Sequence, residues 1–247
     1  MIRKIVYSFV LLTTSISGFS QSKTVDQKVD ALLKKMTLEE KIGQLNQYSG
    51  DNTLTGPLTI NNNKIEEIKT GKLGSMLNVI GAQYTRQYQE VALQSRLKIP
   101  LLFGLDVIHG YKTTFPIPLA EAASWDLKAI ELASRIAASE TAAAGIHWTF
   151  APMVDISRDP RWGRVMEGAG EDTYLGSKIA FARVKGFQGK KLGDLNAVMA
   201  CAKHFAAYGA AVGGREYNSV DLSNRMLWET YLPPFKAAVD AGVGSFM

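Results

Sequence analysis

Cysteine is nearly absent from this sequence of 247 residues, since Cys201 is the only one. An internal disulfide is therefore excluded, and a fold built on a disulfide framework is excluded with it. Histidine is scarce too. His109, His147 and His204 lie far apart and form no H-x-H or H-E-x-x-H pattern of the kind that binds a catalytic metal. We therefore expect no metal site, and no motif calls for a cofactor.

Long apolar runs and concentrated charge are also missing. No run approaches the ~20 apolar residues that a membrane-spanning helix needs, so we expect no membrane span. Basic residues outnumber acidic ones by only 28 to 23, and they are scattered along the chain. Proteins that bind nucleic acid gather their positive charge in patches, so no nucleic-acid partner is expected. The 46% of hydrophobic residues is enough for a sizeable core.

The first twenty residues, MIRKIVYSFVLLTTSISGFS, have the layout of a secretory signal peptide. Two basic residues precede a short apolar stretch from Ile5 to about Leu12, and small residues follow at Gly18 and Ser20. A buried N-terminal helix is the alternative, but the basic start and the polar segment that follows favour a leader. We expect cleavage before Gln21 and export to the periplasm or the extracellular space.

The rest of the chain alternates helical segments with short apolar runs. A capping box of Thr37 and Glu40 predicts a helix start within the first helical segment, and a polar loop is expected over 49–63. Helical periodicity covers residues 25–45, 64–71, 83–97, 127–145, 176–189 and 227–242. The apolar runs cover residues 73–80, 99–110, 146–157, 195–209 and 243–247.

This alternation predicts an α/β fold with a parallel sheet covered by helices. A doubly wound nucleotide-binding sheet would carry a G-x-G-x-x-G turn straight after a strand, and none is found. The alternative is a (β/α)8 TIM-type barrel, in which functional groups lie at the carboxyl ends of the strands. The distribution of polar residues favours the barrel.

Polar residues follow three successive apolar runs. Asp106 and His109 end the run at 99–110, the charged segment DISRDPRWGR follows the next, and Lys203 and His204 end the run at 195–209. If these runs are neighbouring parallel strands, the residues meet at one rim. Such a set can hold a hydroxylated ligand through charge-assisted hydrogen bonds.

Each of these residues also has a structural interpretation. Asp106 could cap the following helix, and we interpret His109 and His147 as structural. Some of the charges at Asp155, Arg158, Asp159 and Glu171 are expected to pair with one another and hold their loop, because so many cannot all touch one ligand. Lys203 is different, since it follows the buried segment VMACA and an unpaired buried ammonium is costly.

The pair Lys203-His204 sets a geometric problem. Successive side chains of a regular strand point to opposite faces of the sheet, so the two cannot both reach one pocket from extended backbone. We therefore predict a bulge or a non-proline cis peptide at this pair.

Five segments together resemble glycoside hydrolase family 3, whose members include β-glucosidases and β-xylosidases. They occur in the family's order over nearly all of residues 25–247: MTLEEKIGQL, GLDVIHG, FAPMVDISRDPRWGRVMEGAGEDTYL, AKHFAAYGAAVGGREYN and YLPPFKAAVDAGVGSFM. The resemblance implies hydrolysis of a terminal β-linked glucosyl or related residue from an oligosaccharide or glycoside, with retention of configuration. It implies no cofactor.

The resemblance also implies substrate-binding residues. Asp106, Arg164, Lys203 and His204 would hold sugar hydroxyls at the site of cleavage, and Glu216 of GGREYN would approach the same region.

The two catalytic carboxyl groups of the family are expected elsewhere. Retention needs two such groups about 5 Å apart, one as nucleophile and one as acid/base. In the family the nucleophilic Asp lies on a later barrel strand, and two-domain members take the acid/base from a second domain. Both positions fall beyond Met247, so we expect no catalytic residue in this chain. We interpret residues 21–247 as about the N-terminal half of the barrel, inactive by itself.

The type of enzyme within the family is not fixed by these motifs. A one-domain branch of the family cleaves N-acetyl-β-glucosaminides with an Asp-x-His-type loop, but residues 209–221 contain no His, which favours the two-domain β-glucosidase type. A β-xylosidase of the same family and a non-catalytic exported sugar-binding protein both stay open. A metal-dependent barrel hydrolase is disfavoured because the three histidines are dispersed.

Overall fold

The computed structural model describes residues 24–50 and 63–247, and the chain divides after Met36 into two units. In the first unit, α1 (Val25–Leu33) begins at a capping box formed by Thr24 and Gln27. The predicted signal peptide, residues 1–20, lies outside the described residues.

Six parallel strands run through the described part of the second unit. Four form one sheet in chain order, and the last two form a parallel pair. They are β1 (Gln47–Ser49), β2 (Ser75–Leu77), β3 (Leu102–Leu105), β4 (Trp148–Thr149), β5 (Cys201–Ala202) and β6 (Ser245–Phe246). Isolated parallel bridges join Trp148 to Met199 and Met153 to Lys203, next to β4 and β5. The predicted α/β fold with a parallel sheet is therefore confirmed.

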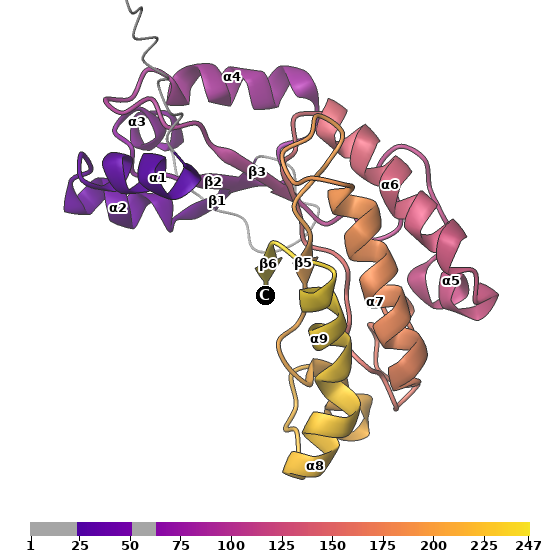
Figure 1. Ribbon diagram of the computed structural model, residues 1–247. Coiled ribbons are helices and arrows are strands. Elements are labelled where there is room, and N and C mark those ends of the chain that lie inside the picture. The colour runs from indigo at the N-terminus through magenta and orange to yellow at the C-terminus, as the bar shows by residue number, and fades with distance from the viewer. Residues whose placement is uncertain (1–23, 51–62) are drawn as a thin grey trace, which may run out of the picture. The chain divides into compact units, whose positions relative to one another are not determined.

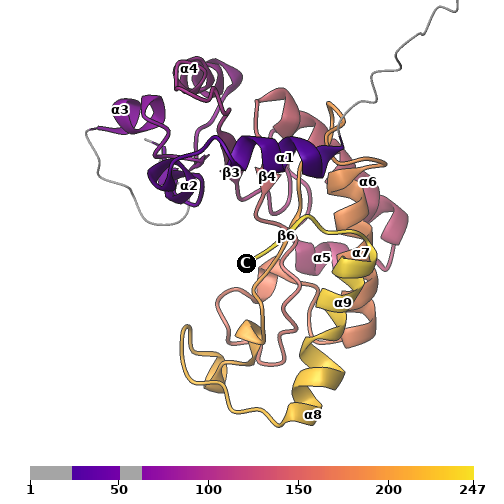
Figure 2. The same ribbon diagram turned by 60° about the vertical axis from the view of Figure 1, so that its left-hand side comes forward.

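The helices of the second unit separate these strands along the chain. They are α2 (Leu38–Gln44), α3 (Lys64–Lys69), α4 (Ala82–Ala92), α5 (Pro118–Ser124), α6 (Leu127–Ala143), α7 (Thr173–Gln188), α8 (Asn224–Met226) and α9 (Pro233–Asp240). Figure 1 shows α6, α7 and α9 side by side, and the turned view of Figure 2 shows the same neighbours. None of the helices in residues 24–50 and 63–247 is long and apolar enough to cross a membrane.

Side chains at the helix starts explain several boundaries. Thr37 Oγ1 accepts from the Glu40 backbone N–H at 3.2 Å, and the Glu40 carboxylate accepts from the Thr37 N–H at 2.9 Å. This capping box starts α2 as predicted. Asp126 and Asp172 cap α6 and α7 without a reciprocal bond, accepting from backbone N–H groups of the first turn: Lys128 and Ala129 for Asp126, and Leu175 for Asp172.

Several elements differ from the sequence prediction, among them β1, α5 and the segment 227–242. Ser49, expected in a loop, instead ends β1, whose three residues are too few to show a period. The helix α5 is not among the predicted segments, although Pro118 at its start suits a first helical position. The predicted helix over 227–242 is divided into a π-helical turn, η4 (Leu227–Tyr231), and α9, because Pro233 and Pro234 break a helix interior but start a new one well.

The main core lies between the strands and the helices α6, α7 and α9. It includes Leu105, Val107, Ala137, Ala138, Ile146, Val184, Phe187, Val198, Ala200, Phe235 and Ala238. Close packing of α6 on α7 requires a glycine at position 186, since a Cβ there would lie 2.4 Å from the Glu131 carbonyl oxygen. The core supports the loops that leave the carboxyl ends of the strands.

Candidate functional site

A cleft of about 1120 Å³ lies at the carboxyl ends of the parallel strands. Its lining includes the last residue of β2 and the residues that directly follow β3 to β6: Leu77, Asp106, Phe150, Lys203 and Met247. Arg164, Glu167 and His204 add charge and hydrogen-bonding groups, and Phe205, Tyr208 and Tyr217 add aromatic surface. The cleft is therefore where the sequence predicted a polar rim.

Lys203 and Asp106 form an ion pair in this cleft. The Lys203 Nζ lies 2.6 Å from Asp106 Oδ1, and the exposed fractions of the two side chains are 3% and 17%. The Lys203 backbone is held as well, donating to the Pro152 carbonyl at 3.2 Å and accepting from the Val154 N–H at 2.8 Å. The buried ammonium thus has the partner that its burial requires, and the partly exposed carboxylate borders the cleft.

His204 is held by Asp155 and Arg164. Asp155 Oδ2 accepts from the His204 backbone N–H at 2.9 Å and lies 2.8 Å from its Nδ1. The Arg164 Nη1 lies 3.3 Å from His204 Nε2. A guanidinium can only donate, so Nε2 accepts and the ring proton is on Nδ1, where it bonds Asp155. This network fixes the orientation of the His204 ring between Asp155 and Arg164.

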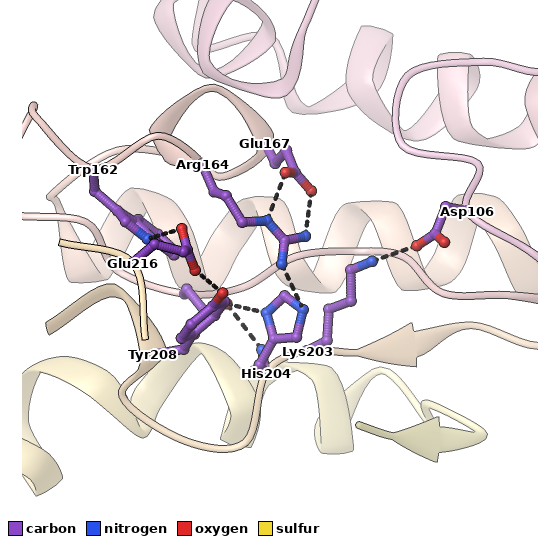
Figure 3. A network of polar contacts seen from close by, with 9 residues as sticks. Asp106, Trp162, Arg164, Glu167, Lys203, His204, Tyr208 and Glu216 are labelled. Atoms are coloured by element: carbon purple, nitrogen blue, oxygen red, sulfur yellow. Dashed lines mark hydrogen bonds and ion pairs between the residues drawn. The ribbon is translucent and has the colours of Figure 1, made fainter. Parts of the chain in front are cut away.

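Arg164 is oriented by a bidentate pair with Glu167. Its Nε and Nη2 donate to the two Glu167 oxygens, both at 2.7 Å, and its guanidinium lies 5.6 Å from the centre of the Tyr208 ring. The hydrogen bond with Glu167 raises the pKa of Arg164 further above its ordinary value, against the opposing effect of burial. Figure 3 shows Arg164 between Glu167 and His204.

Glu216 joins the network from outside the cleft. Its carboxylate accepts from Trp162 Nε1 at 3.0 Å and from the Tyr208 hydroxyl, as Figure 3 shows. Of these three residues only Tyr208 lines the cleft. The structure therefore brings together Asp106, Arg164, Lys203 and His204, while Glu216 reaches them through Tyr208.

The peptide between Lys203 and His204 is cis, which confirms the prediction of a departure from regular strand geometry at this pair. Both side chains line the cleft. The peptide between Phe205 and Ala206 is cis as well.

His109 and His147 make the backbone contacts expected of structural residues. His109 Nδ1 lies 2.9 Å from the Phe115 carbonyl oxygen, although its ring also borders the cleft. His147 Nδ1 accepts from the Phe103 N–H at 3.2 Å, and burial lowers the pKa of His147. Asp106 does not cap the following helix, because Ile117 occupies the N-cap position of α5.

The charged residues of the loop after β4 have two roles: some pair within the loop, and one bonds His204. Asp159 pairs with Arg161 within the loop at 2.6 Å, and hydrogen bonds from Arg161 lower the pKa of Asp159 to about 2. Asp155, which the sequence placed in the same structural set, instead bonds His204. Sequence reasoning did not single out Glu167, although its i,i+3 spacing from Arg164 could have indicated the pair.

The described ranges, 24–50 and 63–247, contain no cluster of three or more His, Cys, Asp or Glu side chains placed to hold a metal ion. The polar groups of the cleft are bonded to one another in pairs of opposite charge or in complementary donor and acceptor roles. Together they define a parallel α/β domain whose strand-end cleft suits a neutral, hydroxylated ligand.

Residues 37–247 match the model of the glycosyl hydrolase family 3 N terminal domain, so the chain belongs to this family. It is 50% identical to a periplasmic β-glucosidase of Salmonella typhimurium over 90% of this chain and 28% of that protein. It is 34% identical to a β-xylosidase of Formosa agariphila over 95% of this chain and 29% of that one.

A similar solved structure is the β-glucosidase from Listeria innocua in complex with isofagomine. It has a TM-score of 0.84 and 46% identity, and the match covers 91% of this chain and 32% of that one. The chain thus spans about a third of the length of the relatives it matches.

Proposed function

We propose that this chain supplies the first part of the substrate-binding site of a retaining β-glucosidase. In this proposal residues 1–20 are a signal peptide, and residues 21–247 are the N-terminal part of a (β/α)8 catalytic barrel in a longer protein. The chain order of the parallel strands and the helices between them support the barrel. The greater length of the relatives supports a longer protein.

The observation that carries the proposal is the convergence of four polar residues in one cleft. Asp106 offers acceptor oxygens and Lys203 and Arg164 offer donors, while the His204 ring lines the same cleft and bonds Arg164. A sugar hydroxyl both donates and accepts, so adjacent hydroxyls can bond an acceptor and a donor of this set at once. The aromatic rings of Phe205 and Tyr217 border the same space and can cover the apolar faces of a sugar ring.

A terminal β-linked glucosyl residue is the proposed substrate. Relatives named β-glucosidase support it. Two structures of the Listeria innocua β-glucosidase support it as well, one in complex with glucose and one of a mutant in complex with laminaribiose. A β-xyloside is the second candidate, because a β-xylosidase covers nearly all of this chain at 34% identity. The periplasmic relative also supports export of the protein to the periplasm or extracellular space.

We do not assign the catalytic carboxyl groups to the described residues. Asp106 and Glu167 are the carboxylates among the residues that line the cleft, and each is bound to a cation, Lys203 or Arg164. A carboxylate in a close ion pair is a weaker nucleophile and a poor proton donor. The proposal therefore places the nucleophile and the acid/base in parts of the longer protein beyond Met247.

The test compares the longer protein with residues 21–247 expressed alone, on aryl β-glucosides and aryl β-xylosides. The longer protein should hydrolyse the glucoside with the larger kcat/KM, and residues 21–247 should not exceed a heat-inactivated blank. Preference for the xyloside would support the second candidate. Hydrolysis by residues 21–247 alone would refute the placement of the catalytic groups.

A further inference from the structure

A buried ion pair lies away from the cleft, between Glu121 on α5 and Arg183 on α7. The exposed fractions of their side chains are 8% and 4%, and Arg183 Nη1 lies 3.8 Å from Glu121 Oε2. This separation is too long for a hydrogen bond. Glu121 Oε2 and Arg183 Nε are buried atoms that make no hydrogen bond to the described residues.

Such a pair is poorly explained as a source of stability. Burial raises the pKa of Glu121 and lowers the pKa of Arg183, so burial disfavours the charged form of both groups. Buried ion pairs of this kind contribute less to the stability of the folded state than apolar residues of similar volume would. We therefore look for a role of Arg183 other than stabilising the fold.

Arg183 also donates from Nη2 to the backbone carbonyl of Ile108. Ile108 lies two residues after Asp106, in the segment that leaves β3 and borders the cleft. The neighbouring Val107 N–H donates to Thr149 Oγ1 at 3.2 Å. The backbone next to Asp106 is thus held by two side chains, one from β4 and one from α7.

The rest of this loop is held separately. Glu140 on α6 accepts from the backbone N–H groups of Lys112 and Thr113, both at 2.9 Å, and from the Thr113 hydroxyl at 2.6 Å. These contacts fix the far end of the loop. The Arg183 contact acts nearer to the cleft carboxylate, on the carbonyl of the second residue after Asp106.

We propose that Arg183 and Glu121 form a positioning pair that fixes the backbone after β3 and so places the Asp106 carboxylate for its ligand. Glu121 attracts one side of the guanidinium and leaves Nη2 directed at the Ile108 carbonyl. The proposal rests on the proposed function for the identity of the ligand, a terminal β-linked sugar. Neither residue is among those that line the cleft, so both act through Asp106.

The test uses three variants of the longer protein: Arg183→Met, the double variant Arg183→Met with Glu121→Gln, and Lys178→Met as a matched control. Lys178 is a cation on the same helix, and its ammonium lies over the Tyr174 ring. The double variant removes both buried charges, so it should recover the stability that the single variant loses. It cannot restore the donor to Ile108.

In both Arg183 variants, KM for an aryl β-glucoside should rise about tenfold while kcat changes less than about twofold, since binding of ground state and transition state weakens equally. Hydrogen exchange of the amides at 107–110 should accelerate in both and stay unchanged in Lys178→Met. A double variant with wild-type KM and exchange would overturn the proposal and leave a purely structural pair.

The two readouts separate this proposal from the proposed function. If the wild-type longer protein hydrolyses no β-glycoside, the proposed function fails, and hydrogen exchange still decides whether Arg183 holds the loop. If the wild type is active and exchange at 107–110 is unchanged without Arg183, only the positioning proposal fails.

Discussion

Two of the ion pairs of this domain, Lys203–Asp106 and Arg183–Glu121, join the same kinds of charged group in opposite surroundings. Lys203 and Asp106 approach to 2.6 Å beside an open cleft, and Asp106 is 17% exposed. Arg183 and Glu121 stand 3.8 Å apart in the interior with little exposure of either. A pair at the cleft can share its hydrogen bonds with water or a ligand, whereas an enclosed pair can act only on its fixed neighbours. The comparison contrasts a pair that we propose binds a ligand with a pair that we propose positions the binding residue.

The largest expected effect is on stability at the enclosed pair. Arg183→Met should lower the free energy of unfolding by about 3–5 kcal/mol, because the buried Glu121 loses its counter-charge. Lys203→Met should cost clearly less, since Asp106 can be solvated from the cleft. Urea denaturation of both variants measures the difference. Equal losses would mean that the cleft does not solvate Asp106.

The next effect is on catalysis at the cleft. Lys203→Met and His204→Ala should each lower kcat/KM of the longer protein for an aryl β-glucoside at least tenfold, about 1.4 kcal/mol, because in the proposed site each removes a group that binds a sugar hydroxyl or orients one that does. Steady-state kinetics measure this, with Lys178→Met as the control. If either variant has the kcat/KM of the wild type, the assignment of that residue to the binding site is wrong.

A smaller effect concerns pH. The pKa of Glu121 is raised from its ordinary value of 4.5 by burial, so the folded state binds the proton more tightly than the unfolded state. The contribution of Glu121 protonation to the free energy of unfolding is therefore fully present below pH 4.5. It is lost as pH rises through the pKa of Glu121 in the folded state. Compared with Glu121→Gln, the wild-type free energy of unfolding should fall as pH rises from 4.5. Parallel pH curves for the two proteins, from urea denaturation, would contradict this assignment.

The smallest effect is expected at the exposed pair Asp159–Arg161. Arg161→Gln should return the pKa of Asp159 from about 2 toward 3.8, as NMR titration of the carboxyl would report. Stability from this pair is present above pH 3.8 and is lost as pH falls toward 2, but solvent screening keeps it small. Activity should not change. A loss of activity would indicate that this loop has a function beyond its own structure.

Local patterns account for much of the fold. The capping box of Thr37 and Glu40 and the long periodic segments of α6 and α7 are predictable, because they depend on residues within a few positions. The strand β1 is not, since its three residues pair only through β2. When an element is stabilised by residues distant in the chain, its own sequence shows little of the periodicity from which it could be predicted.

The sequence by itself determined which polar residues follow the strands, and hence that Asp106, Lys203 and His204 would meet at one rim, since parallel strands bring their carboxyl ends together. Only the tertiary structure decided the partners: Asp155 with His204, Arg183 with Ile108 and Glu121, and Glu216 with Trp162 and Tyr208. Each of these contacts depends on how separate loops and helices pack, and neither spacing nor periodicity carries that information.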